Sequence, residues 1–182
     1  MHYCDYTATL PPDNPHRRYH DHEYGYPIAE DDRLFERLVF EINQAGLSWT
    51  TILNKADNLR RAYDHFDIAR VAAYGEADIA RLLTDAGIIR NRRKIVAAIH
   101  NARVICELQA AHGSFRAWLD AQAGADKAAW VKLFKKTFAF TGPEITGEFL
   151  MSSGYLEGAH RRDCPVYARI LAARPRWLTG GG

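Results

Sequence analysis

The sequence has little of what marks a secreted or membrane protein. It holds only three cysteines and two methionines in 182 residues. No run of about eighteen apolar residues occurs, as a membrane-spanning helix requires, and the first residues lack the basic and apolar blocks of a signal peptide. We therefore expect a cytoplasmic protein with no membrane partner. Three cysteines cannot all pair with one another, and in a reducing compartment thiols more often serve as ligands or core residues than in disulfides.

The composition is that of a folded chain. Hydrophobic residues make up 47%, charged residues 25% and aromatic residues 12%, which is typical of a soluble globular protein. The length predicts a single domain over residues 1–182. A net charge of +2 is too small to establish nucleic-acid binding, but the basic residues are clustered, most densely at 90–94.

Two cysteines and two histidines near the ends of the chain have the chemistry of a metal site. Cys4 and His20 lie near the start, and His160 and Cys164 form a His-x3-Cys pair near the end. Thiolate and imidazole ligands favour zinc, and four protein ligands leave no position for a catalytic water. We expect a structural zinc clasp between residues 1–25 and 155–170. Chance coincidence is the alternative on spacing alone.

The hydrophobic pattern is almost entirely helical. Leu34, Leu38 and Ile42 belong to one apolar stripe, with Asp31 or Asp32 as the expected N-cap. Further helix starts are expected at Ser48, Asp67, Ser114, Asp126 and Pro143, and a long helix is expected from about 91 to 111. Only residues 137–141 look strand-like. The predicted fold class is all-α, with packed helices and short connections.

Residues 82–95 resemble the helix-hairpin-helix DNA-binding motif. An apolar helix end is followed by Gly87, which we expect to turn left-handed, then by Ile88 and Ile89, and then by a new helix that opens with basic residues. The start of that helix and the turn amides form an anion site suited to a DNA phosphate. The expected DNA contacts are Gly87, Ile88, Arg90, Arg92, Arg93 and Lys94.

Three longer segments resemble the DNA-3-methyladenine glycosylase I family. They are Tyr-His-Asp-His-Glu-Tyr-Gly at 19–25, Glu-Ile-Asn-Gln-Ala-Gly-Leu-Ser-Trp at 41–49 and Asp-Ala-Gly-Ile-Ile-Arg at 85–90. The resemblance implies a helix-hairpin-helix glycosylase fold with a structural zinc ion. It also implies a monofunctional enzyme that hydrolyses the N-glycosidic bond of 3-methyladenine, or of a related N3-alkylated purine, in double-stranded alkylated DNA during base excision repair. We expect a monomer.

Glu41 is the expected catalytic residue. It follows Leu34 and Leu38 on one helical face, near the C-terminal end of the helix, where the helix dipole disfavours a carboxylate. The alternative is a partly exposed glutamate paired with an arginine. Excision requires the base to be flipped into a pocket and held there by stacking. Tyr19, Trp49 and Tyr24, and more weakly Tyr6, are expected to form that pocket, although each taken alone could be a core aromatic.

Three further expectations concern the residue that fills the gap left by the flipped base, the absence of lyase activity and the base preference. Leu47, in the turn before Trp49, either wedges into the gap left by the flipped base or is buried core. Enzymes of this type that also cut the strand usually carry a lysine just after the hairpin, where this chain has Arg90 and Asn91, so no lyase activity is expected. Tyr6, Tyr24, Ile42 and Asn43 depart from the usual family residues, which leaves the base preference open.

Two other function classes compete with the glycosylase interpretation. One is a non-catalytic, zinc-stapled helix-hairpin-helix protein that binds damaged or bent DNA. The other is a zinc hydrolase, in which Asp21, His22 and Glu23 beside His20 supply further ligands or a base. Glu41 within an apolar stripe argues against the first, and chelation separates the second from a structural staple.

Overall fold

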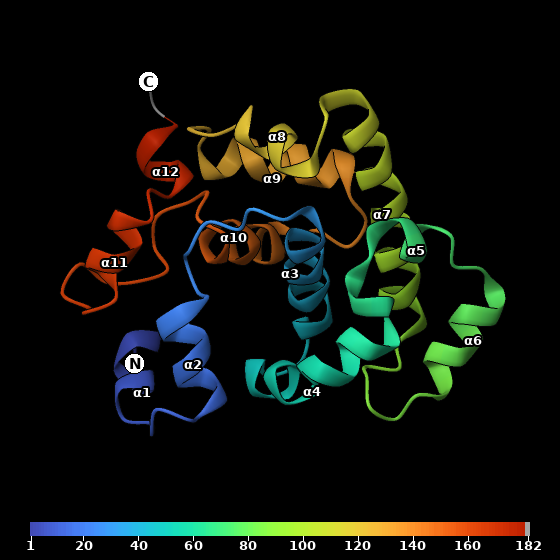
Figure 1. Cartoon of the computed structure of the whole chain (residues 1–182), viewed down its shortest axis with the longest axis horizontal. Helices are drawn as coiled ribbons and strands as arrows, with labels where there is room; N and C mark the ends of the chain where they lie inside the picture. The colour runs from blue at the N-terminus through green and yellow to red at the C-terminus, as the bar shows by residue number, and fades with distance from the viewer. Residues whose placement is uncertain (181–182) are drawn as a thin grey trace.

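The computed structural model describes residues 1–180, and within that range all regular structure is helical (Figure 1). This confirms the all-α prediction. None of the helices described is long and apolar enough to cross a membrane. The elements are α1 (Tyr3–Ala8), α2 (Pro15–His22), α3 (Asp31–Gln44), α4 (Trp49–Ala62), the 3-10 turn η1 (Asp64–Phe66), α5 (Ile68–Ala72), α6 (Glu76–Thr84), α7 (Arg92–His112), α8 (Phe115–Asp120), α9 (Lys127–Thr137), α10 (Pro143–Ser152), α11 (Tyr167–Ala172) and α12 (Arg176–Thr179).

Helix α3 is the central element of the fold. Every residue from 34 to 43 is buried, because α4, α7, α8 and α10 pack around it (Figure 1). A helix covered on all sides normally carries apolar residues throughout. Here the buried stretch also includes Glu36, Arg37 and Glu41. The charged residues inside α3 therefore require partners or a function.

The two ends of the chain lie on the same side of the molecule. Figure 1 shows α1 and α2 (blue) on the same side as α11 and α12 (red). Cys4 from the first segment packs with Cys164, Val166 and Ile170 from the last in a small cluster separate from the main core. Residues of the segments 1–25 and 155–170 therefore lie in contact.

Several predicted helix starts are confirmed by their caps. The side chains of Ser48, Asp67, Asn91, Ser114 and Asp126 each accept a hydrogen bond from the first turn of the helix that follows. Pro143 occupies the first turn of α10, where a missing N–H has no consequence.

The predicted N-cap of α3 is wrong. The capping position is Glu30, and Asp31 and Asp32 lie in the first turn. The Asp31 carboxylate instead accepts from the backbone N–H groups of Phe115 and Arg116 at 2.8 and 3.0 Å, and Asp32 accepts from Ile68 N–H at 3.2 Å. Both aspartates therefore cap other helices, α8 and α5, which the local pattern could not show.

The strand-like segment at 137–141 is not a strand. Thr137 ends α9, and Phe140 has a φ of +63°, which an extended strand does not permit. Ala139 instead exchanges two hydrogen bonds with the Asn101 side chain of α7, at 3.0 and 2.8 Å. The segment is a tight connection between α9 and α10.

Candidate active site

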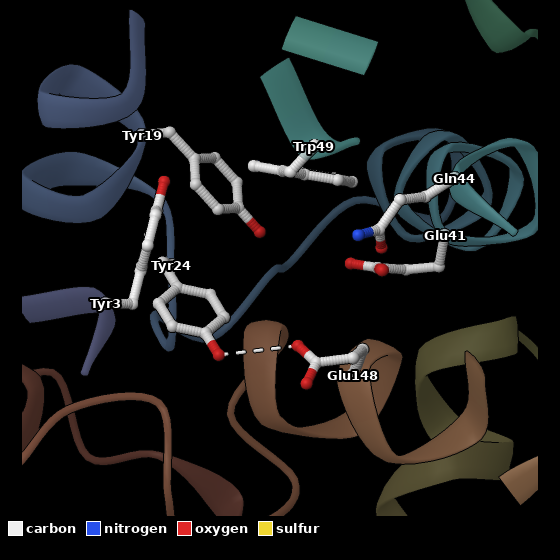
Figure 2. A pocket seen from close by; sticks show the side chains of 7 residues that line it. All are labelled: Tyr3, Tyr19, Tyr24, Glu41, Gln44, Trp49 and Glu148. Atoms are coloured by element: carbon white, nitrogen blue, oxygen red, sulfur yellow. Dashed lines mark hydrogen bonds between the residues drawn. The ribbon is translucent and has the colours of Figure 1, made fainter. Parts of the chain in front are cut away.

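A cavity of about 230 Å³ opens beside the C-terminal half of α3 (Figure 2). Five helical regions contribute to it. It is lined by Tyr3 from α1, Tyr19 and Tyr24 from α2 and the loop that follows, Glu41 and Gln44 from α3, Trp49 from α4, and Glu148 from α10. Pockets for drug-sized ligands usually measure about 300–1,000 Å³, so this cavity has the dimensions for a smaller, flat ring system.

Aromatic rings form one wall of the cavity. The ring centroids of Tyr19 and Trp49 lie 5.1 Å apart, those of Tyr19 and Tyr24 lie 5.5 Å apart, and Tyr3 meets Tyr24 edge-on at 5.6 Å. The Trp49 indole N–H is buried without a hydrogen-bond partner among the described residues. Such a wall offers stacking surface together with a free donor.

Glu41 supplies a buried carboxyl group at the cavity. Its side chain is 4% exposed, and no described residue donates a hydrogen bond to it. Burial raises the pKa of Glu41 to about 8, an effect that the positive charge of Arg37 opposes and the negative charge of Glu148 reinforces. The exposed, arginine-paired alternative is thus excluded. A carboxyl held in this way is typical of a functional group rather than a stabilising one.

Glu148 brings a second carboxyl group to the same cavity. The Tyr24 hydroxyl donates a hydrogen bond to Glu148 Oε2 at 3.4 Å, and Figure 2 shows both side chains pointing into the space in front of Glu41. Burial raises the pKa of Glu148, although the hydrogen bond from Tyr24 opposes that effect. None of the seven lining residues is basic, so the cavity as a whole is suited to a cation.

The sequence predicted part of this lining. The structure brings Tyr19, Tyr24, Trp49 and Glu41 together as expected. Tyr6 does not line the cavity: it is 38% exposed, and its ring packs against His16 at 5.3 Å. The prediction for Tyr6 is wrong because Tyr3, one helical turn earlier and stacked on Tyr6 at 6.3 Å, occupies the position next to Tyr24 in the cavity wall.

Three lining residues were not predicted. Gln44 could have been found, because it lies three residues after Glu41 on the same helical face. Tyr3 adjoins the ligand Cys4, which offers only a weak signal. Glu148 comes from a helix remote in sequence, and no local pattern connects it to Glu41.

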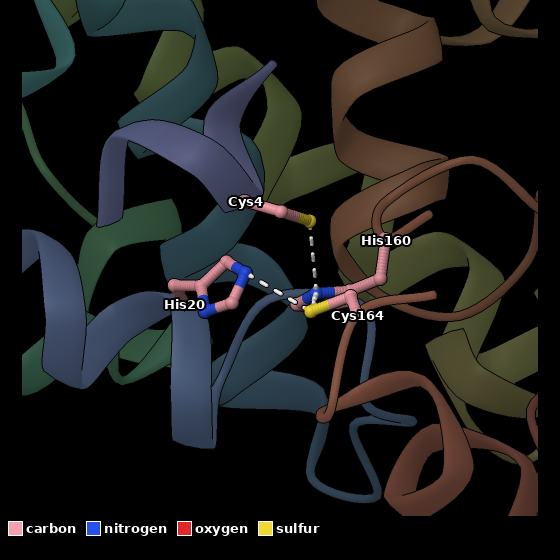
Figure 3. Close-up of side chains that lie close together, drawn as sticks. All are labelled: Cys4, His20, His160 and Cys164. Atoms are coloured by element: carbon pink, nitrogen blue, oxygen red, sulfur yellow. Dashed lines mark hydrogen bonds between the residues drawn. The ribbon is translucent and has the colours of Figure 1, made fainter. Parts of the chain in front are cut away.

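The four predicted metal ligands converge in one buried cluster (Figure 3). Their ligand atoms all lie within 4.8 Å of one another. The sulfur of Cys164 is 3.7 Å from both His20 Nε2 and His160 Nδ1, and the sulfur of Cys4 is 3.8 Å from His160 Nδ1. Ligands at roughly 2.0–2.3 Å from a shared tetrahedral ion are separated by about 3.5 Å. The group can therefore hold a metal ion with little rearrangement.

The second ring nitrogen of each histidine makes a contact that is also typical of a metal site. His20 Nδ1 is 2.7 Å from Asp21, and His160 Nε2 is 2.7 Å from the backbone oxygen of Tyr24. Each contact leaves the other ring nitrogen facing the two sulfurs, as is usual for metal-binding histidines. Burial lowers the pKa of His160 to about 4, so the ring is neutral and available as a ligand.

None of the three residues required for the zinc-hydrolase interpretation belongs to the group of possible metal ligands. Asp21 is engaged with His20 and with Arg17, whose guanidinium it binds at 2.7 Å. His22 and Glu23 are exposed, and neither belongs to the cluster of four ligands. The metal cluster therefore has a complete set of protein ligands and no additional base.

The predicted hairpin lies between α6 and α7. Ile88 is buried, as expected, and Gly87 donates its N–H to the Asp85 side chain at 2.8 Å. Gly87 is not among the residues with positive φ, so the expected left-handed turn is wrong. A Cβ atom there would instead lie 3.0 Å from the Asp85 side chain and 3.1 Å from the Asn58 side chain, so glycine permits an approach that is closer than most Cβ contacts.

The basic residues after the hairpin divide into two groups. Arg90, Arg92 and Arg93 are exposed, and Arg92 pairs with Glu76 at 3.0 Å. Lys94 departs from the expected DNA-facing position: it is 5% exposed, and its ammonium donates to the backbone oxygens of Asn43 and Ala45 at 2.8 and 2.6 Å. It satisfies the C-terminal carbonyls of α3, which attract a cation.

Leu47 projects from the turn between α3 and α4. Its side chain is 41% exposed, which excludes the buried-core alternative. Gly46 beside it has a φ of +79°, a conformation that glycine adopts without strain. Leu47 lines a second, outer cavity. Glu41, Gln44 and Glu148 line both this outer cavity and the aromatic cavity. Leu47 therefore stands at the mouth of the aromatic cavity.

Comparison with known proteins agrees with this geometry. The sequence model of the methyladenine glycosylase family matches residues 10–167. The chain belongs to this family. It is 35% identical over 168 residues to DNA-3-methyladenine glycosylase 1 of Escherichia coli strain K12, covering 82% of this chain and 89% of that protein. It is 30% identical over 166 residues to DNA-3-methyladenine glycosylase of Haemophilus influenzae, covering 81% and 89%.

Solved structures of methyladenine glycosylases share the fold. A variant of 3-methyladenine DNA glycosylase I in complex with 3-methyladenine superposes with a TM-score of 0.81 at 30% identity, and the match covers 91% of this chain and 97% of the other. The resemblance noted in the sequence is confirmed, and the all-helical architecture is that of the family.

Proposed function

We propose that this methyladenine glycosylase hydrolyses the N-glycosidic bond of 3-methyladenine, or of a closely related N3-alkylated purine, in double-stranded alkylated DNA. The observation that carries the proposal is the cavity in which Tyr19, Tyr24 and Trp49 surround the buried carboxyl of Glu41. A flipped base is held in such sites by stacking and by hydrogen bonds to its edge. The known relatives carry the names of enzymes with this activity.

The charge of the substrate provides most of the chemistry. A base alkylated at N3 is cationic, so its glycosidic bond is already weakened, and the aromatic wall favours a desolvated cation by about 1–2 kcal/mol. Glu41, whose pKa is raised to about 8 by burial, becomes ionised more readily when a cation enters, because an opposite charge lowers the pKa of a carboxyl. Its carboxylate then accepts hydrogen bonds from the base and stabilises the developing sugar cation, and water completes hydrolysis.

The DNA would approach across the hairpin and the α3–α4 turn. Gly87, Ile88 and the exposed Arg90, Arg92 and Arg93 surround the start of α7, where backbone amides and positive charge suit a phosphate. Leu47 at the mouth of the cavity is suited to fill the space that the flipped nucleotide vacates.

The metal site is proposed to hold zinc in a structural role. Cys4, His20, His160 and Cys164 form a mixed sulfur and nitrogen ligand set that zinc favours. A bound ion would supply a cross-link between the ends of the chain. His160 also contacts the Tyr24 backbone oxygen at 2.7 Å, so the cluster positions one wall of the base cavity.

We further propose that the enzyme has no lyase activity, because Lys94, the lysine that follows the hairpin most closely along the sequence, is buried with its ammonium bound to backbone oxygens. A lyase would need a free amine at the sugar. Trapping of a DNA adduct by borohydride would contradict this proposal. We also propose that the protein acts as a monomer in the cytoplasm.

Incubation of the protein with methylated duplex DNA, followed by chromatography of the released bases, tests the proposed activity. We expect free 3-methyladenine to be the main product. Binding of the DNA without release of any base would instead support a non-catalytic protein that recognises damaged or bent DNA.

A further inference from the structure

Glu148 is a cavity residue that the proposed reaction does not yet use. It extends from α10 into the space that Glu41 enters from α3, so two carboxyl groups from different helices share one small cavity (Figure 2). The other lining residues are three tyrosines, a tryptophan and a glutamine. The cavity therefore holds two acids and no base.

The surroundings of Glu148 do not explain it as a stabilising residue. It forms no ion pair within 4 Å among the described residues, and its single hydrogen bond, from Tyr24, is long at 3.4 Å. The side chain of Lys127 lies over the neighbouring Gly147, but Lys127 is exposed to solvent. A half-buried carboxylate without a close cation is unfavourable unless it takes up a proton or a ligand provides the opposite charge.

The position of Glu148 gives its charge a direct effect on a base in the cavity. Figure 2 shows its carboxyl group beside the Tyr24 hydroxyl and facing the same space as the Glu41 carboxyl. In a desolvated site, a second negative charge stabilises a cation but gives little to a neutral ring of the same shape. The raised pKa values of both acids are consistent with a site that lacks its cation.

We propose that Glu148 is a specificity-determining residue which, together with Glu41, makes the cavity select a positively charged alkylated base over a neutral base of the same shape. This inference rests on the proposed glycosylase function and extends it. It assigns part of the discrimination between cationic and neutral bases to a residue of α10.

The test compares Glu148→Gln with the wild type on two probes. The cationic probe is 3-methyladenine in methylated duplex DNA, read as single-turnover release. The neutral probe is a duplex that carries 3-deaza-3-methyladenine, read as binding affinity. We expect release from the cationic probe to fall at least about fivefold, and affinity for the neutral probe to change by less than about twofold.

Controls separate charge from shape and from folding. Glu148→Asp keeps the charge on a shorter side chain and is expected to release 3-methyladenine faster than Glu148→Gln does. Glu107→Gln makes the same change on the exposed face of α7, outside the cavity, and is expected to match the wild type. Thermal unfolding establishes that each variant is folded, and Glu148→Met replaces the glutamine variant if that one is not.

The outcomes distinguish this inference from the proposed function. If the wild type releases no methylated base, the proposed function is wrong and the inference falls with it. If the wild type releases 3-methyladenine and Glu148→Gln does so equally fast, only the inference is overturned. Equal losses on the cationic and neutral probes would also overturn it, because they would indicate an effect of shape.

Discussion

Glu41→Gln is expected to make the protein more stable and less active at the same time. The Glu41 pKa is about 8 in the folded protein because of burial, against 4.5 for the free side chain. Between these values the unfolded chain is ionised while the folded chain holds a proton, so the free energy of unfolding falls as pH rises through this window. Near pH 7, about 2.5 pH units above the free value, burial of Glu41 costs roughly 3 kcal/mol. A glutamine has no charge to desolvate and avoids most of this cost.

The predicted effects are large enough to measure. A gain of 1 kcal/mol raises the Tm of a domain of 150–250 residues by about 2–4 °C, so we expect the variant to melt several degrees above the wild type at pH 7. Loss of the carboxylate should slow single-turnover release of 3-methyladenine at least about tenfold, or roughly 1.4 kcal/mol. Calorimetry between pH 6 and 8 with saturating zinc, together with the excision assay, provides both readouts.

The pH dependence of stability, measured in the wild type and in Glu41→Gln, separates the effect of Glu41 from that of other groups. The free energy of unfolding of the wild type, taken relative to that of Glu41→Gln, should decline between pH 6 and 8. An unchanged excision rate would remove Glu41 from the mechanism. A variant that melts below the wild type would refute the reasoning that the buried carboxyl is unfavourable for stability.

The remaining predictions concern the metal, the mouth of the cavity and the hairpin. One zinc per chain is expected by elemental analysis, and a strong chelator should remove fold and activity together, whereas loss of activity with the fold intact would indicate a catalytic metal. Leu47→Ala should leave the Tm unchanged, because the side chain is 41% exposed, but should slow excision from duplex DNA. Arg93→Ala should weaken DNA binding and reduce the slope of log K against log salt by about 1. Lys94→Ala should instead lower stability by about 1–3 kcal/mol, since two carbonyls of α3 lose their donor, and an unchanged Tm would contradict its inward placement.

The site was predictable from sequence where residue chemistry and local spacing coincide. Cys4, His20, His160 and Cys164 form the buried cluster that their ligand chemistry, the His-x3-Cys spacing and the family resemblance together predicted. Glu41 was found because helical periodicity placed a carboxylate on an apolar face, and the family resemblance indicated its aromatic neighbours. Local caps such as Ser48 were also correct, because a cap depends only on the residues next to it.

The errors arose where contacts between helices decide the outcome. Asp31 caps α8 rather than its own helix, Lys94 turns inward to bind the end of α3, and Glu148 reaches the cavity from α10. Each of these depends on the packing of elements that lie far apart in the sequence. Residues at such positions look the same locally as exposed charges.

The central claim is that the aromatic cavity beside Glu41 holds the alkylated base, and a crystal structure of the protein soaked with 3-methyladenine tests it most directly. We predict that the purine ring lies against Tyr19 and Trp49, with the Glu41 carboxyl within hydrogen-bond distance of its edge. A base bound elsewhere, or a cavity that stays empty at saturating concentration, would contradict the account.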